Sequence, residues 1–473
     1  MSTADTSQVP NTTPDGPIDP VHDGSGLYGS PVFVGLIVTQ LLGAFNDNYF
    51  KQMVLLKCTD LADGGGANLQ PLALAAFALP FVLLSGVSGF LSDRYSKRWL
   101  MIGCKVLEIV VMAASLIALL AGSTSTSQLQ LLIIVLAFMG LQSTVFGPAK
   151  YGILPELYRG RTLVPVNGAI QMTTFLAIIF GTAAAGIALD QLNDSLWMCS
   201  TVAIAIAIFG TATSFLIRRT PVAQPDLKFS LDGLFVPRTV RQCFREQPRL
   251  FAALCVMALF WFVGGIAQPA VNDLGKLTLN LNDTRTSLAA ASIGFGIAVG
   301  CVVAGVNGSR PGADRNTWVR IGSKLIVVAL IVICLVGSGV FGAPTQSKGI
   351  KEPLIDSLIR ADGIEWLLRF SMFFLGFAAG TFVIPIQVYI QETPPSEIKG
   401  RMIGSMNLMS WTAILLSAGF LFAMHKLIEV FSPAGRANEF HFATFGVLGL
   451  FMLPVALLYR LPETETTEAA GSR

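Results

Sequence analysis

Trp99-Leu-Met-Ile-Gly-Cys-Lys105 returns later in the chain as Trp318-Val-Arg-Ile-Gly-Ser-Lys324. Asp93-Arg94 lies shortly before the first copy, and Asp314-Arg315 lies shortly before the second. Because tryptophan is rare and the two copies share their spacing, we interpret them as the same position in two related halves. The repeat predicts that the chain folds as two related halves.

Two further pairs join the same two parts of the chain. Arg159-Gly-Arg161 and Lys399-Gly-Arg401 are each followed, after five residues, by an asparagine. A weaker pair is Ala44-Phe-Asn46-Asp47 and Ala270-Val-Asn272-Asp273, with Lys51 and Lys276 following. All three pairs connect the first half to the second, which predicts an internal duplication.

The composition is that of a membrane protein. Hydrophobic residues make up 53% of the chain, charged residues only 13%, and the mean hydropathy is +0.64, so a soluble domain could not cover its surface with charge. Stretches of about twenty apolar residues, each able to cross a ~30 Å hydrocarbon layer, recur at about 31–56, 71–92, 99–122, 129–149, 163–189, 196–217, 250–272, 286–306, 317–342, 364–391, 402–428 and 440–460.

The positions of Lys and Arg predict the orientation. With both termini in the cytoplasm, 20 basic residues flank the cytoplasmic helix ends and 9 flank the opposite ends, as the positive-inside rule requires. Trp99, Trp197, Trp318 and Trp366 stand at helix starts, where interfacial aromatic residues belong. The net charge of +3 is explained by this topology, so nucleic acid is not an expected partner.

These patterns predict an all-α integral membrane protein with twelve transmembrane helices in two six-helix halves. Such a parallel repeat is the layout of the major facilitator fold, with the substrate path between the halves. The expected divisions are a disordered cytoplasmic tail at 1–30, a first half at 31–217, a cytoplasmic linker at 218–249, a second half at 250–460 and a cytoplasmic tail at 461–473.

The first helix carries a polar run, Leu-Leu-Gly-Ala-Phe-Asn-Asp-Asn-Tyr-Phe-Lys-Gln at 41–52. Placing an aspartate at the centre of a membrane helix costs roughly 2.5–3.5 kcal/mol, so Asp47 is a candidate for substrate binding. Asp47 and Lys51 are four residues apart and can pair on one face. Asn46 and Asn48 point about 100° to either side, and one of them can instead pack against a neighbouring helix.

Other polar residues in the apolar stretches are also candidates for substrate binding. Lys105 and Glu108 share a face; we expect Lys105 to extend to the cytoplasmic surface and Glu108 to need a partner. The alternative role for this pair, and for Asp47, is contact between helices. Lys150 and Tyr151 end the fourth helix, where a lysine more often anchors the helix than binds a phosphate.

In the seventh helix, Gln268 and Asn272 are further candidates for substrate binding, and they flank Pro269. A kinked helix end there would free backbone groups and suit a gate. Glycine spacings such as Gly376 to Gly380 and Gly181 to Gly186 favour close helix packing over ligand binding.

A charged loop follows the second helix. Gly89-Phe-Leu-Ser-Asp-Arg-Tyr-Ser-Lys-Arg98 is similar to the loop signature of the major facilitator superfamily, with a serine for its usual second glycine. We expect Asp93, Arg94, Lys97 and Arg98 to latch the cytoplasmic ends of the helices, together with Arg161 and Arg401, when the protein opens outward. The alternative is that these charges only anchor the topology.

Several classes are not indicated. There is no P-loop, so no ATP hydrolysis is expected, and no catalytic constellation suggests an enzyme. The seven cysteines are scattered without a CxxC motif, which predicts neither a disulfide framework nor a zinc site. The three histidines, His22, His425 and His441, give no evident proton relay. No cofactor and no metal ion are expected.

The chain resembles the bacterial lysophospholipid transporter (LplT) family of the major facilitator superfamily. The residues that carry the resemblance are Gly43-Ala-Phe-Asn-Asp-Asn-Tyr-Phe-Lys51, Phe146-Gly-Pro-Ala-Lys-Tyr-Gly-Ile-Leu-Pro155, Asn167, Met172-Thr-Thr-Phe-Leu-Ala-Ile178 and Gly181-Thr182. It is strongest over 31–190. The family usually has leucine where Tyr49 stands and asparagine where Gln52 stands.

The resemblance implies movement of lysophosphatidylethanolamine and lysophosphatidylglycerol from the outer to the inner leaflet of the bacterial cytoplasmic membrane. There they would be reacylated by a separate acyltransferase and acyl-carrier-protein synthetase, which some relatives carry as a fusion. The transporter itself is expected to be a monomer among membrane lipids.

The candidate residues suit such a cargo. Asp47 could meet the ethanolamine ammonium, Lys51 or Lys105 could meet the phosphate, and phenylalanines could line the path of the acyl chain. Because each buried methylene is worth roughly 0.8 kcal/mol, we expect the lipid to enter sideways, through a gap beside the first or seventh helix. The alternative function is a facilitator for a soluble solute or drug, although Gly181 to Gly186 lacks the proline typical of drug antiporters.

Overall fold

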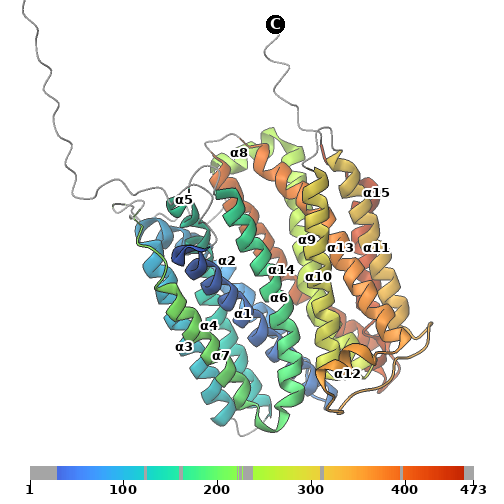
Figure 1. The fold of residues 1–473 in the computed structure, drawn as a ribbon. Coiled ribbons are helices and arrows are strands. Elements are labelled where there is room, and N and C mark those ends of the chain that lie inside the picture. The colour runs from blue at the N-terminus through green and yellow to red at the C-terminus, as the bar shows by residue number, and fades with distance from the viewer. Residues whose placement is uncertain are drawn as a thin grey trace, which may run out of the picture.

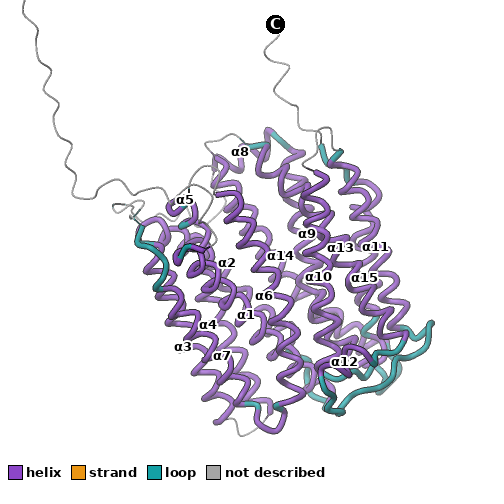
Figure 2. Tube along the Cα trace, viewed as in Figure 1, coloured by secondary structure: helices purple, strands orange, loops and turns teal. Residues whose placement is uncertain are grey.

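A computed structural model describes residues 29–462, except 122–124, 159–162, 221, 223–225, 227–237, 309–313 and 395–397. Within these residues the regular structure is helical, with no strand (Figure 2). Twelve long helices are α1 (Pro31–Asp63), α2 (Gln70–Arg94), α3 (Lys97–Ala121), α4 (Ser125–Gly152), α6 (Leu163–Gln191), α7 (Trp197–Ser214), α9 (Pro248–Asp273), α10 (Asp283–Gly308), α11 (Arg315–Gly337), α13 (Gly363–Glu392), α14 (Lys399–Phe431) and α15 (Ala443–Leu458).

Each of the twelve predicted apolar stretches is one of these helices, which confirms the predicted fold class. Eleven helices in the described residues are long and apolar enough to cross a membrane. The exception is α1, because its polar run at 46–48 lowers its hydropathy. Its 33 residues are still long enough to span a bilayer.

The helices form two bundles of six, with α1 to α7 in one and α9 to α15 in the other (Figure 1). Each bundle has its own apolar core. The bundles meet where α6 packs against α10, α2 against α14 and α1 against α9. On the α2–α14 contact, Phe81 stacks on Trp411 with ring centroids 3.6 Å apart.

Glycines allow the closest of these helix contacts, as their spacing predicts. A Cβ on Gly181 of α6 would lie 2.6 Å from the carbonyl oxygen of Phe45 in α1. In the second half, Gly376 and Gly380 of α13 face the backbone of α10, with no room for a side chain. These spacings therefore serve packing.

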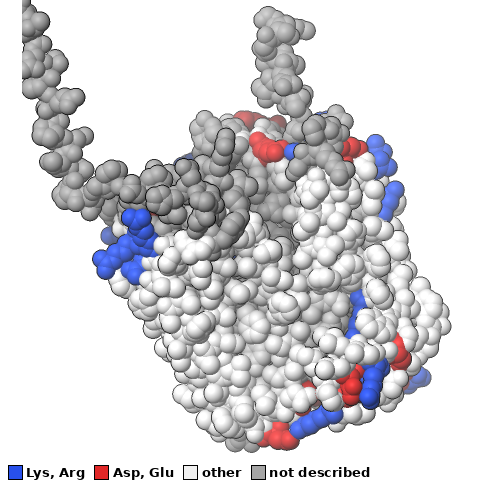
Figure 3. All heavy atoms as spheres, in the orientation of Figure 1, with Lys and Arg blue, Asp and Glu red and all other residues white. Residues whose placement is uncertain are grey.

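Short helices mark the two ends of the molecule (Figure 1). We call the end that carries α8 (Arg238–Glu246) the linker face and the end that carries α12 (Leu354–Ile359) the α12 face. Charged side chains gather towards these two ends, and the band between them is nearly free of charge on the face shown in Figure 3. The remaining short elements are α5 (Leu154–Leu157), η3 (Asn193–Ser195), η5 (Leu274–Thr278) and η7 (Ala437–Phe440).

The internal repeats differ in how well they match the structure. Trp99 and Trp318 both lie close to the start of a helix, in α3 and α11, as expected for a duplicated half. The weakest pair does not correspond in this way, because Asp47 lies in the middle of α1 whereas Asp273 is the last residue of α9. Helix α9 continues through Pro269 and passes at Leu274 into the π-helical turn η5.

Candidate functional site

A network of amide side chains joins the two halves near the α12 face. Gln52 of α1 donates to Asn272 Oδ1 of α9 at 2.8 Å, and Gln268 donates to Gln52 Oε1 at 2.8 Å. Asn272 in turn donates to Gln70 Oε1 of α2 at 3.0 Å. Gln52, Gln70 and Asn272 are almost fully buried. Buried amides need such partners, so these hydrogen bonds stabilise the contact between the two halves at the α12 face.

Asp273 adds a charge to this contact. Its Oδ1 accepts hydrogen bonds from Asn68 at 2.8 Å and from Gln70 at 2.7 Å, both from the first half. The carboxylate is only 1% exposed. Hydrogen bonds to a charged group are stronger than those between neutral groups, so Asp273 strengthens the contact between the halves at the α12 face.

Ionic contacts surround the amides. The ammonium of Lys276, in η5, lies between Asp60 of α1 and Asp283 of α10. Asp190 of α6 accepts hydrogen bonds from the backbone nitrogens of Asp283 at 3.2 Å and Thr284 at 2.6 Å. A carboxylate at a helix N-terminus satisfies free N–H groups and the helix dipole, so the first half caps α10 of the second.

More exposed contacts complete the closure. Lys348 pairs with Asp63 at 2.5 Å and Lys351 with Asp194 at 2.6 Å, while Gln191 donates to the carbonyl of Glu352 at 2.9 Å. Such exposed pairs each contribute about 0–1 kcal/mol. They contribute less than the buried network.

Every hydrogen bond or ion pair between described residues of the two halves lies towards the α12 face. Within the described residues, the halves are therefore fastened together at the α12 face.

Asp47 lies against the fourth long helix. Its Oδ2 accepts from Ser143 of α4 at 2.6 Å, while its Oδ1 is buried and has no hydrogen-bond partner. The expected pair with Lys51 is not among the ion pairs between described residues; Lys51 donates instead to Asn48 Oδ1 at 3.2 Å and lies 5.6 Å from the centroid of the Phe77 ring. Asp47 thus keeps one oxygen free to accept another donor.

Lys150 adds a second ammonium on α4, within electrostatic reach of Asp47. It is mostly buried and lies 4.6 Å from the centroid of the Tyr151 ring. Tyr151 is exposed and donates to Gln171 of α6 at 3.1 Å. One carboxylate with a free oxygen and two ammonium groups therefore lie on α1 and α4, which suits a ligand carrying both charges.

Asn46, Lys105 and Glu108 form a separate network between α1, α3 and α7. Glu108 accepts from Asn46 at 2.8 Å and pairs with Lys105 at 2.5 Å; Asn46 also donates to the carbonyl of Ala203 at 3.2 Å. All three are at most 1% exposed. The expectation that Lys105 extends to the membrane surface is wrong, because Glu108 holds it inside the bundle.

Lys97 and Arg98 of the charged loop after α2 contact other parts of the first half. Lys97 pairs with Glu156 of α5, and Arg98 donates to the carbonyl of Phe215 at 3.2 Å. Asp93 is exposed and Arg94 lies 5.7 Å from the centroid of the Phe90 ring.

The two arginines expected to complete the latch belong to other parts of the chain. Arg161 lies outside the described residues. Arg401 donates to Thr239 of α8 at 3.4 Å. The second half repeats the relationship of Lys97 to Glu156, since Arg315 at the start of α11 pairs with Glu392 at the end of α13 at 2.6 Å.

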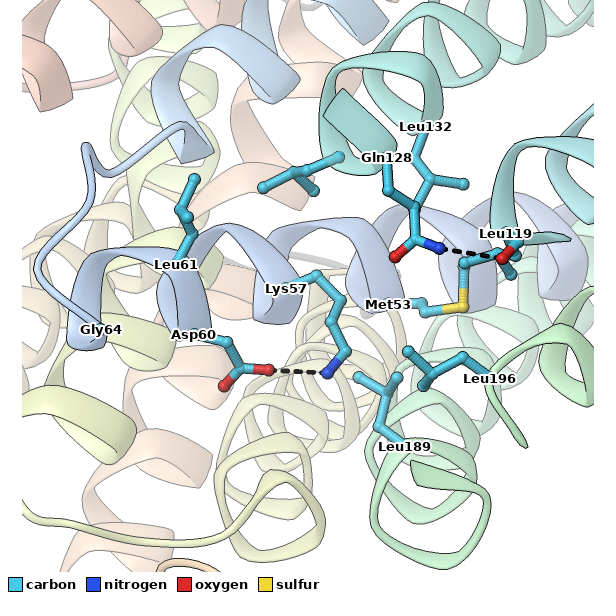
Figure 4. A pocket seen from close by; sticks show the side chains of 11 residues that line it. Met53, Lys57, Asp60, Leu61, Gly64, Leu119, Gln128, Leu132, Leu189 and Leu196 are labelled. Carbon is cyan, nitrogen blue, oxygen red and sulfur yellow. Dashed lines mark hydrogen bonds and ion pairs between the residues drawn. The ribbon is translucent and has the colours of Figure 1, made fainter. Parts of the chain in front are cut away.

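Two cavities lie away from Asp47. One of about 310 Å³ opens inside the first half near the α12 face, where Lys57 and Asp60 approach each other at 2.9 Å among leucines (Figure 4). An apolar groove of about 230 Å³ lies between α2 and α4 and includes Leu83 and Phe138. The sequence predicts a sideways gap beside the first or seventh long helix, whereas this groove lies beside the second long helix.

Sequence reasoning missed most of the residues that fasten the halves. Gln52 was noted only as a departure from the family pattern, and Lys276 only as part of a weak repeat. The residues not singled out are Asp60, Asn68, Gln70, Asp190 and Asp283. Their one signal is that they are polar residues at or near the ends of apolar stretches, which also describes many residues without a role.

The fold is that of an α-helical membrane transporter built from two six-helix halves. Residues 36–419 match the model of the Major Facilitator Superfamily, and the chain belongs to that superfamily. The solved D-xylose-proton symporter has a similar fold, with a TM-score of 0.64, 15% identity, and coverage of 92% of this chain and 98% of that one. The xylose transporter XylE of E. coli in its inward open conformation gives a TM-score of 0.61 at 13% identity, with coverage of 92% and 98%.

Three curated relatives carry the same name. The lysophospholipid transporter LplT of Salmonella gallinarum is 25% identical over 412 residues, which is 84% of this chain and 88% of the relative. Those of Serratia proteamaculans and Salmonella arizonae are each 24% identical, over 82% and 93% of this chain and 86% and 97% of theirs. The chain is therefore similar to these transporters along most of its length.

Proposed function

We propose that the protein moves lysophospholipids, chiefly lysophosphatidylethanolamine and lysophosphatidylglycerol, from the outer to the inner leaflet of the bacterial cytoplasmic membrane. The observation that carries the proposal is the Oδ1 of Asp47, which has no hydrogen-bond partner, on the same pair of helices, α1 and α4, as the ammonium groups of Lys51 and Lys150. A zwitterionic head group would place its ammonium on Asp47 and its phosphate on a lysine. The name shared by relatives that match most of the chain supports the same cargo.

Alternating access accounts for the asymmetry of the structure. In the proposed orientation the α12 face is external and the linker face is cytoplasmic, with both termini inside. The halves are then closed to the outside and able to release cargo to the inner leaflet. The reacylating enzymes would be separate proteins that act on the delivered lipid.

The acyl chain would stay in hydrocarbon throughout. Moving a chain of about sixteen carbons into water would cost on the order of 12 kcal/mol, which a polar cavity does not return. The apolar groove between α2 and α4 supports this part of the proposal, because its lining is apolar and could hold a chain. Sideways entry is therefore part of the proposal.

The loop from Asp93 to Arg98 is proposed to latch the linker face in the outward-open state. Its present partners within the first half, Glu156 and the carbonyl of Phe215, are those expected when the latch is released. Asp93→Ala should then slow transport and favour the inward-open state, which cysteine accessibility at the linker face would report. Unchanged accessibility would leave the loop an anchoring role alone.

The test of function is transport by the purified full chain in liposomes. Labelled lysophosphatidylethanolamine is added outside, and the fraction that albumin cannot extract is followed with time. A rate well above that of protein-free liposomes, with no uptake of a labelled sugar or cationic drug, would support the proposal. Uptake of the sugar or the drug without lysolipid movement would establish the facilitator for soluble solutes instead.

A further inference from the structure

Two histidines and an aspartate from distant parts of the second half meet near the α12 face. Asp273 ends α9, His425 lies in α14, and His441 lies between η7 and α15. His425 Nε2 is 2.8 Å from Asp273 Oδ2. The two imidazole rings lie edge to face, with centroids 5.5 Å apart and an interplanar angle of 83°.

The cluster has the ligand set and spacing of a metal centre. One ligand atom from each residue lies within 4.8 Å of the other two. Tetrahedral Zn²⁺ with bonds of about 2.0–2.1 Å places its ligands about 3.3 Å apart, so a small rotation of the side chains would close the site. Two imidazole nitrogens and one carboxylate oxygen suit Zn²⁺ and its neighbours in the first transition row.

Buried groups without partners point to the same site. Asp273 is 1% exposed and His441 is 7% exposed. The Nδ1 atoms of both His425 and His441 are buried without a hydrogen-bond partner. Buried polar atoms are nearly always paired. His425 would bind the ion through Nε2, which faces Asp273, and an ion bound through Nδ1 of His441 would give that atom the partner that the protein does not supply.

The two oxygens of Asp273 serve different neighbours. Oδ1 accepts from Asn68 and Gln70 of the first half, whereas Oδ2 faces His425. An ion on Oδ2 would leave the hydrogen bonds between the halves intact and would fix the carboxylate in the position that makes them.

We propose that Asp273, His425 and His441 bind a divalent transition-metal ion of the Zn²⁺ type, and that the ion stabilises the closed α12 face. Asn68 and Gln70 reach Asp273 only when the halves touch, so metal binding and closure favour each other by the same factor. The site does not depend on which substrate the protein carries.

The test uses the purified full chain without an affinity tag, titrated with Co²⁺ and then with Zn²⁺ as competitor. Co²⁺ in a four-coordinate site gives strong visible absorption, and bound thiolate adds an intense near-ultraviolet band that imidazole and carboxylate do not. We expect one Co²⁺ per chain, no thiolate band, and displacement by Zn²⁺. A thiolate band would assign binding to the cysteines, of which Cys255 is exposed, and would overturn the proposal.

Variants assign the site. His441→Gln and His425→Gln should each weaken Co²⁺ binding at least tenfold, whereas His22→Gln, which changes the remaining histidine of the chain, should bind as the unchanged protein does. His441→Gln is the more tolerant change, because its ring makes no direct bond to Asp273 among the hydrogen bonds of the described residues. Equal binding by all three variants would overturn the proposal.

A second pair of measurements tests the link to closure. Replacing Asn68 and Gln70 together by alanine leaves every proposed ligand in place but removes the contacts between halves on Oδ1. We expect Co²⁺ affinity to fall several-fold in this variant. An affinity equal to that of the unchanged protein would overturn the coupling to the closed face.

Discussion

Gln52 of α1 donates a hydrogen bond of 2.8 Å to Asn272 of α9, and neither side chain is exposed to solvent. The bond crosses between the two halves, so it must break whenever the α12 face opens. Gln52 also accepts from Gln268 at 2.8 Å, which ties its whole amide to the second half. In the proposed alternating-access cycle, the strength of this contact sets part of the balance between the closed and the open α12 face.

Gln52→Leu should shift that balance toward opening at the α12 face. The variant removes the hydrogen bonds of Gln52 to Asn272 and to Gln268, while Asn272 keeps its bond to Gln70. At about 1 kcal/mol for each hydrogen bond, the population of the open state should rise about five-fold or more. Cys58 is buried in α1 and near Asp273, and as the sole cysteine its reaction with a water-soluble maleimide reports the opening. We expect faster labelling in the variant.

Cys199 is the matched control. It is equally buried, in α7, and as the sole cysteine its labelling rate should not respond to Gln52→Leu. An unchanged rate at Cys58 would show that the amide network does not hold the halves together.

Lys276→Met should destabilise the closed structure strongly. Lys276 is buried between Asp60 and Asp283. Its loss leaves the mostly buried Asp283 without a counter-charge, while Asp60 keeps Lys57, and an unpaired buried charge costs about 3–5 kcal/mol. The measurement is thermal unfolding in detergent.

Lys57→Met is the control for this variant, because Lys57 pairs with the same Asp60 at 2.9 Å but is partly exposed. It should change the unfolding temperature little. Equal loss of stability in the two variants would contradict the prediction that Lys276 stabilises the structure more than Lys57 does.

The helices could be predicted from sequence because their cause is local. A run of about twenty apolar residues is sufficient to form a membrane-spanning helix, and every predicted stretch is one. Trp99 and Trp318 marked the duplication because both stand beside helix starts. Depth in the membrane and length of helix follow from the chain itself.

The contacts between halves could not be predicted in this way. Gln52 and Asn272 are 220 residues apart, and His425 and Asp273 are 152 apart, so no spacing along the chain relates them. The role of Asn272 also depends on α9 remaining helical beyond Pro269, which a proline alone does not reveal. The weak repeat of Asn46-Asp47 in Asn272-Asp273 was misleading, since the two pairs lie at different depths.

Lys105→Met tests whether the pair with Glu108 is structural. The lysine side chain passes close to Gly43 and Gly210, and methionine has a similar length, but the change leaves a buried carboxylate without its counter-charge at about 3–5 kcal/mol. We expect a much lower unfolding temperature in the single variant. Glu108→Gln added to Lys105→Met should restore most of the loss, because glutamine can still accept from Asn46.

The double variant separates the two roles of this pair. If Lys105 and Glu108 only hold α1, α3 and α7 together, the double variant should transport lysolipid once it is stable. Full stability with no transport would assign the pair to substrate binding instead.

Asp47→Asn should remove lysolipid transport while leaving the fold intact. The carboxylate has a single hydrogen bond, from Ser143 at 2.6 Å, and the amide oxygen of asparagine can accept the same bond. The variant therefore loses the charge with little change of shape. Since an aspartate costs roughly 2.5–3.5 kcal/mol in a membrane helix, the expression and unfolding temperature of the variant should hold or rise.

Ser143→Ala is the matched variant, because it removes the hydrogen bond and keeps the charge. It should retain most of the transport if the ammonium of the head group binds the free Oδ1.

The assay is the lysolipid movement described above. Lysophosphatidylethanolamine is compared with lysophosphatidylglycerol, because only the first carries an ammonium. Asp47→Asn should reduce the first by tenfold or more and the second less. Normal movement of both cargoes by Asp47→Asn would remove Asp47 from the binding site and leave it as a contact between α1 and α4.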